Sequence, residues 1–233
     1  MASLFETHKA ERRARIQKAA RRLVAERGYD GLTMRDLARA AGVSVPTLYN
    51  LFGGKDAILT AELYEVANAI AAAIPPPGTE GSYFARGMAA FDAGMAIIER
   101  EPEFFRAAIQ MFLTSPATSE MRERVEGAFI AITQMNLEAA QRAGHLVEWA
   151  DPALVARHMH ALQMAAYLAW GLGQLDFATF RAASLSGTCH LLAGVARNAF
   201  HAEVIARLRM IQPELTARLS HQEVTDARSR SRD

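Results

Sequence analysis

The sequence has few of the residues that disulfide-linked and membrane-spanning proteins need. Among 233 residues there is one cysteine, Cys189, so an internal disulfide is excluded and a reducing compartment is favoured. No uninterrupted apolar run reaches the roughly 20 residues of a membrane-spanning helix, because the best stretch, 153–173, contains Arg157 and His158. The N-terminus is charged and has no apolar secretory core. These absences predict a cytoplasmic protein with no membrane partner.

Motifs of common enzyme and metal-binding classes are also missing. The sequence has no G-x-S-x-G turn, no phosphate-binding glycine loop and no HExxH pair. His158 and His160 are two residues apart, so they point to different faces of a helix rather than toward one metal ion. We therefore expect no catalytic residues, no metal and no cofactor. An enzyme is the main alternative class of function, but no motif in the sequence supports it.

Positive charge is concentrated near the N-terminus, although the whole chain carries a formal net charge of only +1. Residues 1–52 contain ten Lys or Arg against five Asp or Glu, whereas residues 53–221 contain thirteen against seventeen. A basic segment attracts nucleic-acid phosphates and an acidic one does not. Lys55 is one of three lysines, and its place at the start of an expected helix suits a phosphate contact.

The segment Thr33–Asp56 predicts two short helices joined by a tight turn. Thr33 followed by Asp36 resembles a capping box at the start of the first helix. Gly42 stands where that helix must end in a left-handed conformation, and Ser44 can cap the second helix through its hydroxyl. Such a pair of helices can place the second one in the major groove of DNA. An ordinary helical hairpin inside an all-helical core is the alternative.

A helix is expected before this motif, with an apolar stripe on one face and a basic bias on the other. The stripe recurs at helical spacing and consists of Ile16, Ala19, Ala20, Leu23 and Val24. The basic face carries Arg12, Arg13, Arg15, Lys18, Arg21 and Arg22. A charged face alone often means only contact with solvent, but its position beside the two-helix motif favours DNA.

Residues 12–60 resemble the DNA-binding domain of the TetR family of bacterial transcriptional regulators. The matching features are a threonine before the second helix, an AGVS turn, a TLY sequence, a phenylalanine and a Lys-acid pair; they are supplied by Thr33, Ala41–Ser44, Thr47–Tyr49, Phe52 and Lys55–Asp56. Two positions depart from the usual pattern. Leu51 stands where the family often has histidine, and Gly54 where it often has serine or asparagine.

This resemblance implies roles for individual residues in binding double-stranded operator DNA. Thr33, Tyr49 and Lys55 are expected to contact phosphates, while Pro46, Thr47 and Asn50 are expected to touch bases. The full set of predicted DNA-binding residues is Thr33, Arg35, Ser44, Val45, Pro46, Thr47, Tyr49, Asn50 and Lys55.

The pattern after residue 54 is also helical, with no run of alternating β-branched residues that would indicate a sheet. The expected fold is therefore all-α, with a three-helix DNA-binding domain followed by a larger helical domain. We place the helix-turn-helix domain at 1–54, the effector-binding and dimerisation domain at 55–221, and a disordered tail at 222–233.

Small residues on the two expected helices 152–173 and 177–200 suggest close packing between helices. In the family that this chain resembles, the last two long helices pair with those of a second copy. The sequence thus predicts a homodimer that reads a palindrome with two recognition helices about 34 Å apart. Packing within one chain is the alternative.

The family that this chain resembles keeps its effector pocket among the middle helices, where this chain is rich in methionine and aromatic residues, so the resemblance implies a pocket there for a hydrophobic small-molecule effector. Such stripes usually form core, but methionine also suits adaptable binding surfaces, and a few polar groups would orient a ligand. The predicted pocket residues are Phe91, Met95, Phe105, Met111, Phe112, Gln134, Met135, His158, Met159, Gln163, Met164 and Tyr167.

These features together predict a ligand-responsive transcriptional regulator, with a repressor favoured. A helix-turn-helix dimer that binds DNA constitutively is one alternative, and an activator is another. The sequence does not encode where the operator lies relative to a promoter, nor which ligand would release the protein.

Overall fold

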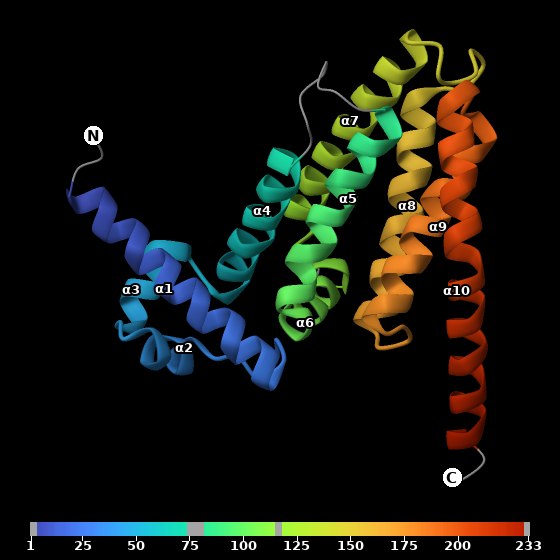
Figure 1. Cartoon of the computed structure of the whole chain (residues 1–233). Coiled ribbons are helices and arrows are strands. Elements are labelled where there is room, and N and C mark those ends of the chain that lie inside the picture. The colour runs from blue at the N-terminus through green and yellow to red at the C-terminus, as the bar shows by residue number, and fades with distance from the viewer. Residues whose placement is uncertain (1–3, 74–81, 115–117, 231–233) are drawn as a thin grey trace. The chain divides into compact units, whose positions relative to one another are not determined.

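A computed structural model describes residues 4–73, 82–114 and 118–230 (Figure 1). Within these ranges the chain is helical and forms no strand, which confirms the all-α fold class. The helices are α1 (Leu4–Arg27), α2 (Met34–Ala41), α3 (Val45–Phe52), α4 (Lys55–Ala73), α5 (Tyr83–Arg100), α6 (Pro102–Thr114), α7 (Ser119–Arg142), α8 (Pro152–Gly171), α9 (Phe177–Val195) and α10 (Asn198–Arg230).

The chain groups into two compact units. The first comprises residues 1–73 and 93–125, and the second comprises residues 74–92 and 126–233. Helices α5 and α7 therefore each contribute residues to both units. The predicted division at residue 54 stays a prediction, and α4 here belongs to the same unit as α1, α2 and α3.

Helix α1 is central to the first unit and packs against α2, α4 and α6. Its predicted apolar stripe is buried as expected: Ile16 and Ala20 are 0% exposed and Val24 is 1% exposed. Leu37 of α2 and Leu48 of α3 are also 0% exposed. The hydrophobic effect thus fixes both short helices against the same core.

A buried ion pair joins α1 to α4. The Arg21 guanidinium donates to Glu62, whose side chain is only 6% exposed. The same guanidinium lies 3.3 Å from Glu101, immediately before α6. One arginine thus connects three segments that are far apart in the sequence.

In the second unit, α9 packs against both α8 and α10, and the three helices run side by side in Figure 1. Trp170 of α8 and Phe180 of α9 are both 0% exposed. Their rings stack with centroids 5.1 Å apart. Helix α8 starts as predicted, with the Asp151 carboxylate accepting from the Ala153 amide and Pro152 in the first turn.

The C-terminal part of the chain differs from the expectation. The structure has one helix, α10, from Asn198 to Arg230 with Pro213 inside it, where the sequence predicted a shorter helix and a disordered tail from residue 222. Pro213 is exposed, so water can satisfy the carbonyl that its missing N–H leaves free. No glycine follows Pro213, which also favours continuation of the helix.

The chemically reactive side chains of the described residues are few. Cys189 is 0% exposed, and burial raises the pKa of its thiol to about 11, which is typical of a structural cysteine. In the described part of the chain, no three His, Cys, Asp or Glu side chains are grouped to hold a metal ion. Nor is any helix there both long and apolar enough to cross a bilayer.

Replacing Arg21 with methionine should lower the free energy of unfolding by about 3 kcal/mol, because the buried Glu62 carboxylate loses its cation. Methionine retains an apolar side chain of similar length, so the variant removes the charge and the hydrogen bonds of the guanidinium while it keeps the packing of the side-chain stem. Chemical denaturation followed by circular dichroism measures the difference.

The matched control is Arg22→Met in the same turn of α1. Arg22 pairs with Glu26 at 3.8 Å, and both side chains are more than half exposed, so its loss should cost at most about 0.5 kcal/mol. Equal losses in the two variants would contradict the role given to the Arg21–Glu62 pair.

Candidate nucleic-acid interface

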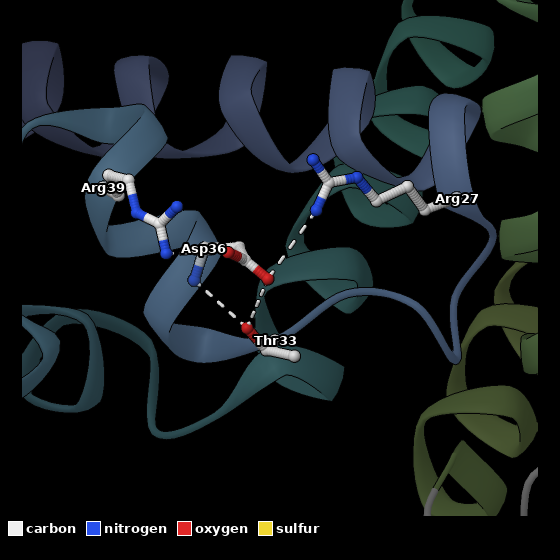
Figure 2. A network of polar contacts seen from close by, with 4 residues as sticks. All are labelled: Arg27, Thr33, Asp36 and Arg39. Atoms are coloured by element: carbon white, nitrogen blue, oxygen red, sulfur yellow. Dashed lines mark hydrogen bonds and ion pairs between the residues drawn. The ribbon is translucent and has the colours of Figure 1, made fainter.

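The start of α2 is fixed by the predicted cap. The Asp36 amide donates to the Thr33 hydroxyl oxygen at 3.1 Å, and the hydroxyl donates to the Asp36 carboxylate at 2.8 Å (Figure 2). Thr33 has the extended backbone of an N-cap residue. Because both bonds are local, the residue types alone account for where this helix begins.

The turn between α2 and α3 also follows the prediction. Gly42 has φ +62°, in the left-handed region that other residues avoid. The next amide, that of Val43, donates to the carbonyl of Ala38 at 3.0 Å, which closes the end of α2. A rigid turn of this kind sets the angle between the two helices.

Helix α3 has one buried residue and an exposed outer face. Ser44 caps it by accepting from the Thr47 amide at 3.3 Å, and the two hydroxyl oxygens lie 2.7 Å apart. Leu48 faces the core. On the outer face Pro46, Tyr49 and Asn50 are exposed, as are Thr33, Arg35 and Ser44 nearby, while Val45 and Thr47 are half-buried. This face offers side chains to a partner without disturbing the core.

The C-terminal end of α3 is held by Arg13 from α1. The Arg13 guanidinium donates to the Leu51 carbonyl at 2.6 Å and lies 4.1 Å from the centroid of the Phe52 ring. A carbonyl at a helix C-terminus carries partial negative charge, which the cation stabilises. The sequence analysis assigned Arg13 to the basic face of its helix. In the structure its guanidinium instead contacts the C-terminal end of α3.

Lys55 opens α4 beside this helix. Its Nζ lies 4.1 Å from the centroid of the Tyr29 ring, and the Tyr29 hydroxyl donates to Asp56. Burial, followed by the bond to Asp56, raises the pKa of Tyr29 above its usual range. The Lys55 ammonium group is thus positioned by a cation–π contact with the Tyr29 ring. This contact leaves its N–H donors available for other partners.

The predicted pocket residues are divided between the two units. Met95, Phe105, Met111 and Phe112 belong to the first unit and are buried in it. The others belong to the second unit, where Phe91, Gln134, Met159, Gln163, Met164 and Tyr167 are partly buried. Met135 is 55% exposed and His158 is also exposed, so neither is enclosed within its unit.

The structure brings two of these residues together in a polar group between α8 and α9. Gln163 donates to the Ser184 hydroxyl at 3.2 Å and is hydrogen-bonded to Tyr167. Burial raises the pKa of Tyr167 to about 12, and its ring packs 5.0 Å from that of Phe180. The sequence analysis missed Ser184, which is 4% exposed.

Sequence comparison places this interface in a known family. Residues 16–61 match the model of the bacterial regulatory proteins of the tetR family. Over 81 residues the chain is 38% identical to the HTH-type transcriptional repressor Rv1474c of Mycobacterium tuberculosis, a match that spans 35% of this chain and 43% of that protein. The shared segment is thus less than half of that relative.

Solved structures share the fold over most of the chain. TylP, a TetR regulator from Streptomyces fradiae, superposes with a TM-score of 0.64 at 20% identity, covering 88% of this chain and 98% of that one. The SmeT–triclosan complex gives a TM-score of 0.64 at 19% identity, covering 82% and 94%. Residues 16–61 thus match the TetR family of bacterial transcriptional regulators, and the chain shares the fold of such regulators.

Replacing Arg13 with alanine should destabilise the protein by about 2 kcal/mol, through loss of a charge-assisted hydrogen bond and a cation–π contact. It should also weaken binding to duplex DNA, because the end of α3 is no longer fixed. Thermal unfolding and DNA titration on the same samples measure both effects.

Its neighbour Arg12 supplies the control, since this side chain is exposed and its replacement by alanine should change stability by no more than about 0.5 kcal/mol. If Arg13→Ala matched Arg12→Ala in stability, Arg13 would not hold α3.

Proposed function

We propose that this protein is a ligand-responsive repressor that binds a palindromic operator as a homodimer and is released by a hydrophobic small molecule. The observation that carries the proposal is the exposed outer face of α3, a helix whose two ends are both fixed by the protein. A helix held in this way can enter the major groove without first being ordered. Chromosomal DNA as the target implies a cytoplasmic protein.

The predicted DNA-binding residues on and around α3 divide into two roles under this proposal. Pro46, Thr47 and Asn50 face the bases, with Val45 beside them on the same helix. Thr33, Arg35, Ser44, Tyr49 and Lys55 face the phosphates on either side. Because phosphate contacts position a protein and base contacts specify its site, changes at the two sets should have different consequences.

A dimer interface on α8 is supported by an apolar face that the chain itself leaves uncovered. The exposed apolar residues of this face lie at helical spacing and are Leu154, Ala161, Leu162, Ala165, Leu168 and Leu172, with the polar His158 among them. Leu162 remains 45% exposed although its Cδ1 lies against Gly187 of α9. Exposed apolar patches of this kind mark interaction sites. A second copy bound to this face would supply the second recognition helix that a palindrome requires.

Release by a hydrophobic ligand is supported by the compounds named for two structures with a similar fold. One neighbour in fold is a complex with triclosan and another is described as a fatty acid degradation regulator. Reversing a 99:1 preference for the DNA-binding state needs about 5.5 kcal/mol of differential ligand affinity. Burial of about 200 Å² of apolar ligand surface supplies that amount.

Two alternative functions, a constitutive DNA-binding dimer and an activator, differ from the proposed ligand-responsive repressor in what can be measured. A constitutive DNA-binding dimer would keep its operator whatever small molecule was added. An activator would bind the same DNA but raise transcription of the neighbouring gene. Recovery of the operator from genomic DNA, followed by reporter transcription with and without candidate apolar ligands, separates the three.

Lys55→Ala should weaken binding to all DNA sequences by a similar factor. If each lysine neutralises one phosphate, the slope of log affinity against log salt should become less steep by about 1.8 per dimer. Fluorescence anisotropy over a range of salt concentrations measures the slope. Arg209→Ala on α10, an exposed arginine that removes the same charge, is the control and should leave the slope unchanged. An unaltered slope for Lys55→Ala would exclude Lys55 as a phosphate contact.

Leu162→Glu should convert the dimer into monomers, because it places two carboxylates in an apolar contact. Sedimentation velocity measures the oligomeric state, and circular dichroism checks that the helices persist. The control is Met135→Glu, which adds the same charge at an exposed position of α7 and should remain dimeric. A folded Leu162→Glu variant that stayed dimeric would rule out this face of α8.

A further inference from the structure

A single carboxylate beside the proposed DNA interface engages three cationic or hydroxyl donors (Figure 2). Asp36 Oδ2 accepts from the Thr33 hydroxyl at 2.8 Å and lies 3.7 Å from Arg27 Nη1. Its Oδ1 accepts from Arg39 Nη2 at 3.1 Å. The donors come from the end of α1, the residue before α2 and α2 itself, so Asp36 joins three neighbouring segments.

These donors are the kinds of group that a DNA phosphate would use. Hydroxyls and guanidinium groups make most protein contacts to phosphate oxygens, and Thr33 is one of the proposed phosphate contacts. The arginine side chains are accessible, with Arg39 80% exposed and Arg27 52% exposed, whereas Asp36 is only 26% exposed. Exposed ion pairs are weak, so a phosphate can compete with Asp36 for both arginines.

We propose that Asp36 acts as an internal competitor for the DNA backbone and lowers the sequence-independent affinity of the protein for DNA. In the free protein it occupies the Thr33 hydroxyl and reduces the charge that Arg27 and Arg39 present. A phosphate that approaches must displace these bonds and lie near a carboxylate. The inference rests on the proposed function, which it deepens by identifying a residue that weakens binding rather than one that makes a contact.

Asp36→Asn in the full-length protein tests this inference. The variant keeps the shape of the side chain, and the residue 36 amide can still donate to Thr33, so the cap of α2 should survive. The probe is duplex DNA of random sequence, titrated at several salt concentrations. Each further phosphate neutralised should tighten binding about eightfold near 0.1 M salt and steepen the salt slope by about 0.9.

Asp36→Gln provides a second neutral variant, because glutamine is a preferred residue at this position of a capping box. It should show the same gain if Asp36→Asn does not fold. The charge control is Asp30→Asn, an exposed acid in the loop before α2, which should change the affinity less than about twofold because salt screens an exposed charge.

A double variant traces the gain to its source. Adding Arg39→Ala to Asp36→Asn should remove most of the increase, because Arg39 is the more exposed of the two arginines that Asp36 engages. Folded neutral variants with unchanged affinity and slope would overturn the inference, as would an equal gain from Asp30→Asn. A wild-type protein that bound no duplex at all would instead overturn the proposed function, and the inference with it.

Discussion

A helix of eight residues with one buried side chain cannot fix its own orientation. Leu48 is the only residue of α3 that is fully buried. A single buried side chain does not by itself fix the direction of the helix axis. The chain supplies the remaining constraints at both ends: the turn at Gly42 and the Ser44 cap at the start, and Arg13 at the Leu51 carbonyl. The outer face of α3 can be polar and exposed because these contacts hold it from behind.

Several arginines of the basic N-terminal segment, residues 1–52, are already engaged by other groups of the protein. Arg13 serves the end of α3, Arg21 lies against two glutamates, and Arg27 and Arg39 flank Asp36. Each of these arginines is already paired with a carboxylate or a backbone carbonyl of the protein itself. Net charge therefore indicates that this segment meets an anionic partner, but the partners of each arginine decide how strongly it does so.

Local signals in the sequence were sufficient for the caps and the turns. Thr33, Gly42, Ser44 and Asp151 act within three or four residues of themselves, so their effects can be read without knowing the fold. Arg13 could have been found by spacing, because it lies three residues before buried Ile16 on the core side of α1. The exposure of Met135 and His158 could not, because it depends on which helix faces receive a neighbour.

The polar group between α8 and α9 bears on what kind of ligand the larger unit can bind. Gln163 is already hydrogen-bonded to Ser184 and Tyr167. A polar ligand would have to replace bonds that the protein makes for itself, which gives little net gain in free energy. An apolar ligand gains from every methionine and aromatic surface that it covers, without breaking those bonds. These hydrogen bonds of Gln163 therefore support the hydrophobic effector of the proposed function more directly than the abundance of apolar residues does.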